Sequence, residues 1–246
     1  MRYELMRPCQ IRDAIAGNTP VVLPIGVLEY HGEHLPLGMD TLAVTRILDR
    51  LEAERDLIIL PPFFYGAASH AVAGPLGTGN LHVDAGRIAP LAEEMFHALL
   101  RIGFRNIHGL IHHQTENFAQ GMPTDLAFRF AGRQAVFRFL ETERGEGWWG
   151  DAAMQDYYAQ QAAGDDPFNW IRIHPLMTPD IIESYPFDHA GIGETSLMLA
   201  LAPETVDMAR LGDQRPWYVE TATQANAELG ARGVALILER LRLLFG

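Results

Sequence analysis

The amino-acid sequence predicts an α/β fold in which a mostly parallel central sheet is covered by helices on both faces. Two observations lead to this prediction. Segments with helical periodicity alternate along the chain with short apolar runs. These runs are apolar almost throughout, which is typical of strands buried on both faces. With 246 residues, the chain is long enough for one large domain of this kind or for two small ones.

The first half of the chain shows this alternation most clearly. The run TPVVLPIGV (19–27) is apolar, rich in β-branched residues and bounded by Pro and Gly, so we expect a buried strand. Residues 40–54 have apolar side chains at helical spacing and begin with Asp40 at the N-cap position. A second strand is expected at 56–62. The glycine-rich segment 63–81 has no clear period, which indicates a long loop of the kind often used for function.

The second half continues with further helices and strands and one irregular segment. Helical patterns predict helices at 84–104, 124–132, 193–201 and 223–244. Apolar runs predict strands at 106–113 and 134–141. Residues 145–187 are rich in aromatic side chains and follow no period, so no regular element is predicted there.

Charge and composition exclude several classes of function. The chain has 19 basic and 31 acidic residues and a net charge of −12, so a nucleic-acid partner is not expected, because phosphate binding requires clustered Lys and Arg. Cys9 is the only cysteine, which excludes a disulfide framework and a cysteine-based zinc site. The first residues contain no apolar signal region, and no uninterrupted apolar run reaches about 18 residues. We therefore expect a soluble, cytoplasmic protein that does not bind membranes.

Polar side chains gather in three segments at junctions between the predicted elements. EYHGEHLPLGMD (29–40) and HHQTEN (112–117) follow strands, and DHAGIGETS (188–196) precedes a helix. In sheets of this type, ligands bind at the carboxyl ends of the strands. Each segment combines His with Asp or Glu and none contains Cys, which is a ligand set suited to Zn²⁺, Mn²⁺ or Fe²⁺. One such segment alone would indicate a solvated loop, but the three together indicate a metal site.

The spacing within the first segment refines this prediction. In an extended chain Glu29 and His31 point to the same side and can converge. Asp40 can return to them after the Gly- and Pro-rich turn and bridge two ions with its two oxygens. His34 lies on that turn, where we expect it to form a hydrogen bond within the loop rather than to bind metal.

These motifs resemble those of the creatininase (creatinine amidohydrolase) family. PIGVLEYHGEHLPLGMDT (24–41) is similar to the family pattern P-x-G-S-x-E-Q-H-G-x-H-L-P-x-x-T-D, and DHAGIGETS is similar to H-A-G-x-x-E-T-S. The resemblance covers residues 19–206 and implies a three-layer α/β/α fold, so we expect a single domain over residues 1–246. It also implies two divalent ions per chain, with Zn or Mn favoured over Fe, and a homo-oligomer, commonly a hexamer.

The resemblance further implies roles for individual residues. Glu29 and His31 match ligands of separate ions, and Asp40 matches the carboxylate that bridges them. Glu194 matches the glutamate ligand of the E-T-S motif. His189 matches the histidine of the H-A-G motif that assists catalysis.

The second motif departs from the family and leaves its ligand open, because IHHQTEN replaces N-G-H-G-G-N. His113 matches the metal-binding histidine of the family, while His112 and Glu116 compete with it. Alternation along a strand places His112 and His113 on opposite faces, so at most one of them is expected to point at the metals. We assign His113 to the metals. His112 and Glu116 are assigned to substrate binding, together with His82 beside the glycine-rich loop.

These assignments predict a metal-dependent hydrolase that acts on a small, polar, cyclic substrate. The bond cleaved would be an amide C–N bond, the usual target of the family, or a ring C–C bond of a cyclic diketone such as a keto-inosose. The altered second motif favours an alternative, a metal-binding structural or regulatory subunit without turnover, whereas retention of the matching residues in the first and third motifs argues against it. A nucleotide-binding protein is disfavoured because the glycine-rich stretch GPLGTGN (74–80) lacks the lysine of a phosphate-binding loop.

Overall fold

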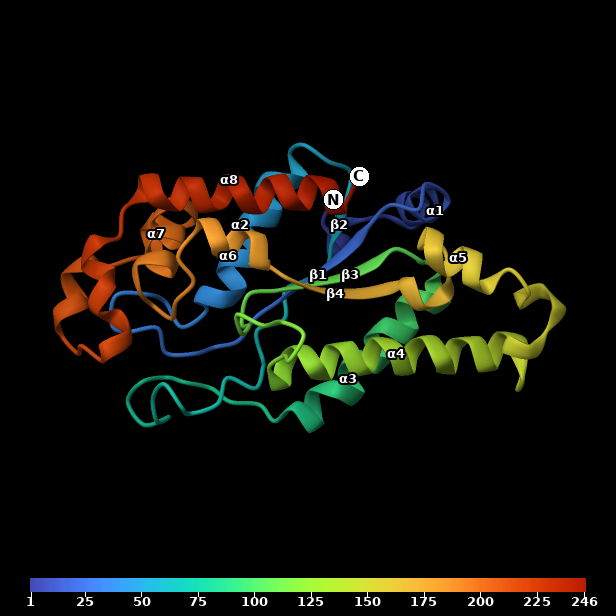
Figure 1. Ribbon diagram of the computed structural model, residues 1–246, viewed down its shortest axis with the longest axis horizontal. Helices are drawn as coiled ribbons and strands as arrows, with labels where there is room; N and C mark the ends of the chain where they lie inside the picture. Colours follow the sequence, from blue (N-terminus) through green and yellow to red (C-terminus); the bar gives the residue numbers. More distant parts are fainter.

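A computed structural model describes residues 1–246, and its centre is a four-stranded, all-parallel sheet (Figure 1). The strand order is β2-β1-β3-β4, and the strands are β1 (Val21–Ile25), β2 (Ile58–Ile59), β3 (Ile107–Ile111) and β4 (Ile171–Pro175). Ile25 of β1 pairs with Ile111 of β3, which pairs with Pro175 of β4. Because these three strands end in register, the segments that follow them leave the sheet at the same edge.

Helices cover both faces of the sheet and form the two outer layers (Figure 1). One layer consists of α2 (Met39–Glu52), α7 (Ile192–Leu201) and α8 (Ala227–Leu244), and the other consists of α3 (Ala85–Ile102) and α4 (Pro123–Arg144). Alternation along the strands supplies both cores, since Val22 and Leu110 pack with the first layer and Leu23 and Ile111 with the second. The predicted α/β fold with helices on both faces of a parallel sheet is confirmed.

The remaining regular elements are short. They are the helices α1 (Pro8–Ala16), α5 (Tyr157–Ala163) and α6 (Pro179–Ser184), together with several 3₁₀ segments. No helix combines the length and the apolar character needed to cross a membrane.

The strand predicted at 134–141 is wrong, because α4 continues through it as one helix from Pro123 to Arg144. The buried residues Val136, Phe139 and Leu140 recur at helical spacing, whereas Phe137 is exposed. Gly132 does not end this helix. A Cβ at Gly132 would lie 2.8 Å from Ile171 of β4, so the glycine allows the helix to approach the sheet closely.

Strand β4 lies inside the segment 145–187, for which no regular element was predicted. Its sequence, IRIHP, is only partly apolar, because β4 is an edge strand whose three central residues are half-buried. His174 of β4 reaches His108 of β3, with 3.0 Å between the ring nitrogens. This pairing between two polar side chains depends on tertiary structure and cannot be read from a local pattern.

Three element boundaries also differ from the predictions. Strand β2 has two residues instead of the seven expected at 56–62, β3 ends at Ile111, and α8 begins at Ala227 after the 3₁₀ segment Trp217–Gln224. The last two boundaries matter for function, because residues 112–113 lie beyond β3 and residues 217–224 lie before α8, and both segments line the same cavity.

Candidate metal centre

The first ligand segment is held by a close contact between the end of β1 and the start of α2. A Cβ at Gly26 would lie 2.5 Å from the backbone nitrogen of Thr41, so only glycine allows this approach. The contact places Asp40, in the first turn of α2, beside Glu29 and His31, and all three side chains are buried. The prediction that Asp40 is the N-cap residue of this helix is wrong. Helix α2 begins at Met39, and its N-cap residue is Gly38.

The second segment brings two histidines into the same cluster. Nδ1 of His113 lies 3.2 Å from Oε2 of Glu29 and 3.5 Å from Oδ2 of Asp40. Nε2 of His112 lies 3.1 Å from Oε1 of Glu194. Only His113 belongs to one of the candidate ligand groups, whereas His112 contacts the carboxylate of Glu194 from outside them. Both follow the last residue of β3, and the chain bends at His113, so strand alternation no longer applies.

The third segment presents Glu194 from the first turn of α7. Asp188 holds the start of this helix, since its carboxylate accepts hydrogen bonds from the backbone N–H groups of Gly191, Gly193 and Glu194. The N–H group of Ala190 donates to Oε2 of Glu194 at 2.7 Å, which fixes the orientation of that carboxylate. The role of Asp188 was missed in the sequence, although an acid shortly before a predicted helix is a recognisable capping signal.

These three segments form two triads that share one carboxylate. The triads are Glu29–Asp40–His113 and His31–Asp40–Glu194, and within each triad the candidate ligand atoms lie within 4.8 Å of one another. Oδ1 of Asp40 lies 3.4 Å from Nε2 of His31, whereas Oδ2 faces His113. The two oxygens of Asp40 thus face different triads, which is the arrangement that a bridging carboxylate requires.

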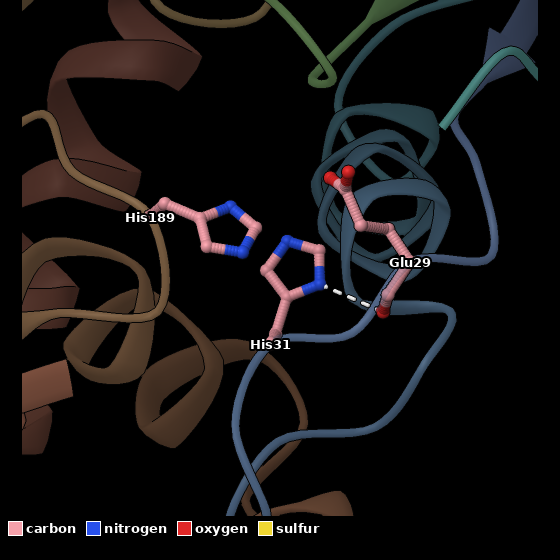
Figure 2. A group of neighbouring side chains, drawn as sticks. All are labelled: Glu29, His31 and His189. Carbon is pink, nitrogen blue, oxygen red and sulfur yellow. Dashed lines mark hydrogen bonds between the residues drawn. The ribbon is translucent and has the colours of Figure 1, made fainter. Parts of the chain in front are cut away.

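The hydrogen bonding of His31 leaves one ring nitrogen available as a ligand (Figure 2). Its Nδ1 lies 3.0 Å from the backbone oxygen of Glu29, and because a carbonyl oxygen can only accept, Nδ1 carries the proton. Nε2 has no hydrogen-bond partner and points toward Asp40 and Glu194. This orientation by a backbone carbonyl is typical of metal-binding histidines.

His189 lies beside this centre and takes no part in either of the two triads. Figure 2 shows its ring on one side of His31 and Glu29 on the other, with 4.3 Å between the two ring centroids. Nε2 of His189 lies 2.9 Å from the backbone oxygen of Tyr30, so this nitrogen donates and Nδ1 remains free. His189 also belongs to a third possible ligand group with Glu29 and His31.

The electrostatics of the cluster favour a cation. Burial would lower the pKa of His31, but the carboxylates of Asp40 and Glu194 raise this pKa to about 10. Burial likewise opposes protonation of His113, but Asp40 and Glu29 raise its pKa to about 10. Burial alone would raise the pKa of Asp40, but the two imidazoles hold it well below its usual range. The site stabilises positive charge and contains only N and O donors, some without a partner, so its residues fit divalent ions.

A cavity of about 760 Å³ lies above the cluster. Glu29, Asp40, His113 and Glu194 contribute to its lining, as do His112, His189 and Glu116. Trp217, Tyr218, Glu220 and Thr221 also line it, and none of these four was identified from the sequence. They belong to the 3₁₀ segment Trp217–Gln224, for which the sequence shows no local signal that would connect it to the site.

The two other histidines considered in the sequence lie elsewhere. His82 is exposed and does not line the cavity; its Nδ1 accepts a hydrogen bond from the backbone N–H of Ser69. His34 is buried and stays outside both triads, as expected, but its partner is not within its own loop. Its Nε2 lies 2.8 Å from Oγ1 of Thr195 in α7, so it connects the first ligand segment to the third.

The fold and this cluster define a class of protein: α/β/α proteins that hold metal ions among buried carboxylates and imidazoles at the carboxyl edge of a parallel sheet. Comparison with known families supplies the particular one. Residues 4–242 match the model of the creatininase family, described as creatinine amidohydrolase. The chain therefore belongs to the creatininase family and is a hydrolase of that family.

Three curated relatives show the range of activities among similar proteins. The chain is 27% identical to the creatinine amidohydrolase of Pseudomonas putida, over 82% of this chain and 71% of that protein. It is 33% identical to the mycofactocin precursor peptide peptidase of Mycolicibacterium smegmatis, over 87% and 73% of the two chains. A shorter match, of 76 residues at 29% identity, covers 31% of this chain and 24% of the 3-dehydro-scyllo-inosose hydrolase of Thermotoga maritima.

Solved structures of creatininases share the fold. A manganese creatininase aligns with a TM-score of 0.67 and 19% identity over 99% of this chain and 98% of the other. A creatininase variant of Zn–Zn type aligns with a TM-score of 0.64 and 18% identity over the same shares of the two chains. At these identities the likeness concerns the fold, and the assignment of individual residues depends on the geometry described above.

Proposed function

We propose that this protein hydrolyses a small, polar, cyclic substrate with the help of two divalent ions, Zn²⁺ or Mn²⁺. The observation that carries the proposal is the position of Asp40 between two triads. Glu29, Asp40 and His113 would hold one ion, and His31, Asp40 and Glu194 the other. Divalent ions bound in this way supply Lewis-acid chemistry, since they acidify water and polarise a carbonyl group.

The residues of the chain would then position the substrate and move protons. Four of the five residues of the two triads line the cavity, and the triad side chains are buried, so we assign the cavity as the route by which a substrate reaches them. Nδ1 of His189 is the nitrogen left free by the bond to Tyr30, and we assign it to carry a proton to the leaving group. His112 contacts Oε1 of Glu194, the oxygen that the N–H group of Ala190 does not bond, and its other nitrogen has no hydrogen-bond partner within the chain.

The bond cleaved is either an amide C–N bond or a ring C–C bond of a cyclic diketone. In the second case attack on one carbonyl expels a carbanion that the other carbonyl stabilises as an enolate. The similar proteins include an amidohydrolase, a peptidase and an inosose hydrolase, which supports hydrolysis without selecting between these bonds.

A panel of lactams, hydantoins and cyclic β-diketones, incubated with protein reconstituted with Mn²⁺ or Zn²⁺, tests the proposal. We expect turnover of at least one class, loss of turnover after dialysis against a chelator, and recovery when the metal is returned. Full metal content without turnover of any compound would favour the alternative of a metal-binding subunit that lacks catalysis.

A further inference from the structure

The outer part of the cavity presents carboxylates that have no partner within the chain. Glu116 and Glu220 both line the cavity and are exposed, and neither side chain forms a hydrogen bond or an ion pair. No Lys or Arg is among the residues that line this cavity. The acidic character therefore extends beyond the metal ligands to the region that a substrate must contact.

Both carboxylates stand on segments that are anchored by hydrogen bonds. The side chain of Gln114 forms two bonds with the backbone of Met177, at 2.7 and 2.9 Å, which ties the segment carrying Glu116 to the chain after β4. The hydroxyl of Tyr218 donates to the backbone oxygen of Val72, and this bond ties the segment carrying Glu220 to the glycine-rich loop. The two acids are thus held over the cavity by the fold.

Two further features of the cavity indicate a ligand. The side chain of His112 is 4% exposed and lines the cavity, yet its Nδ1 has no hydrogen-bond partner. A buried polar atom without a partner is costly, so a substrate group that bonds to it is expected. Trp217 lines the same cavity and is 81% exposed, which leaves an aromatic face available to a ligand.

We infer that the substrate carries a cationic group, an ammonium or a guanidinium, which binds in the outer cavity between Glu116, Glu220 and Trp217. This inference rests on the function proposed above, because it names the class of substrate for that site. Carboxylates attract such a group directly, and the face of an indole ring attracts it through its quadrupole. A substrate that carries a carboxylate or a phosphate in this position is repelled.

The charges of the inner site do not change the preference for a cationic substrate. Glu29, Asp40 and Glu194 would be neutralised by the bound ions, whereas Asp188 is engaged in capping α7. Glu116 and Glu220 remain as the charges that a substrate meets on its way to the metal centre. Since the whole chain has a net charge of −12, its long-range electrostatic field also attracts a cationic substrate.

Three hydantoins that differ only at the end of their side chain test the inference: 5-(3-aminopropyl)hydantoin, its N-acetyl derivative and 5-(2-carboxyethyl)hydantoin. Binding to the Mn²⁺-loaded protein is measured by calorimetry, so the result does not depend on turnover. We expect the order amine, acetylated amine, carboxylate, with about tenfold between the first two at low salt. The preference should shrink as ionic strength rises.

Glu116→Gln and Glu220→Gln locate this preference. Each variant should lower the ratio of amine to acetylated amine affinity by about threefold, the size expected for a partly solvated ion pair. Glu146→Gln removes the same charge from an exposed residue that does not line the cavity, and it should leave the ratio unchanged. Equal binding of the three compounds, stronger binding of the carboxylate, or no binding at all would overturn the inference. Absence of turnover with the binding order intact would instead count against the proposed function.

Discussion

Gly26 and Thr41 touch so closely that a Cβ at Gly26 would lie 2.5 Å from the backbone nitrogen of Thr41 and 2.8 Å from its α-carbon. Gly26 follows the last residue of β1, and Thr41 lies in the first turn of α2. The contact brings the start of α2, which carries Asp40, against the end of β1, which leads to Glu29, so the proposed metal centre depends on a glycine at position 26.

Gly26→Ala should therefore weaken both the fold and the site. The added methyl group has backbone atoms as neighbours, which cannot rotate away, so α2 must shift at a cost of about 1–3 kcal/mol. We expect a lower free energy of unfolding in urea and reduced metal content. Gly150→Ala is the matched control, because nothing lies within 4 Å of a Cβ there and its stability should change little. Equal behaviour of the two variants would contradict the role given to Gly26.

Asp40→Ala should lose both ions and all activity together, because this carboxylate belongs to both triads. Glu33→Ala is the comparison. Glu33 is exposed and accepts a hydrogen bond from the hydroxyl of Tyr30, outside the cluster. Elemental analysis of the purified variants should show a nearly empty Asp40→Ala protein and an unchanged Glu33→Ala protein. Retention of one full equivalent of metal by Asp40→Ala would show that Asp40 is not shared.

His113→Ala and His112→Ala should differ in how much bound metal they lose. His113 belongs to a triad, so its removal should empty one site. His112 contacts Glu194 instead, and loss of such an outer partner typically lowers metal affinity by about 10–100-fold. A metal titration with a competing chelator separates the two results. If His113→Ala kept full occupancy, the ligand would have to be His112 or Glu116.

His189→Asn should lower kcat strongly and leave metal content near that of the unsubstituted protein. The reason is that His189 lies outside the two triads and is assigned to proton transfer, which commonly contributes about 10²–10⁴-fold. Turnover of the best compound from the panel, measured with elemental analysis of the same preparation, checks this. Loss of an ion in His189→Asn would instead make it a ligand in the third group, with Glu29 and His31.

The pair His108 and His174 should make the fold sensitive to acid. Burial lowers the pKa of His108 to about 2 and that of His174 to about 3, so both remain neutral in the folded protein while the unfolded chain takes up protons below about pH 6.5. Stability from each residue is thus complete above about pH 6.5 and declines as pH falls toward the folded pKa.

His174→Gln tests this effect, since the amide can still donate to Nδ1 of His108 but does not titrate. Between pH 7 and pH 5, the unsubstituted protein should lose about 2 kcal/mol more unfolding free energy than the variant. Urea unfolding of both proteins at each pH measures this difference. Any contribution of the metal centre appears in both proteins and cancels. Identical pH dependence of the two proteins would mean that folding does not lower the pKa of His174.

The class of fold was accessible from the sequence, and so were the residues that we propose as metal ligands, because both depend on local patterns. Continuous apolar runs predicted buried parallel strands at β1 and β3, and the comparisons confirm the resemblance to the creatininase family. The convergence of Glu29, His31 and Asp40 follows from a spacing of twelve residues or fewer around one turn. Side chains so close in sequence have little freedom once the strand before them and the helix after them are in place.

Tertiary structure alone decided the features that depend on contacts between distant segments. Helix α4 continues through Gly132 because this glycine packs against Ile171 of β4. Strand β4 forms because its backbone pairs with that of β3. His112 and His113 both enter the cluster because carboxylates from two other segments attract them. Glu220 lies more than a hundred residues after Glu116 in the sequence, and tertiary packing brings both to the lining of the same cavity. Packing and electrostatic contacts of this kind act through space, so no periodicity along the chain records them.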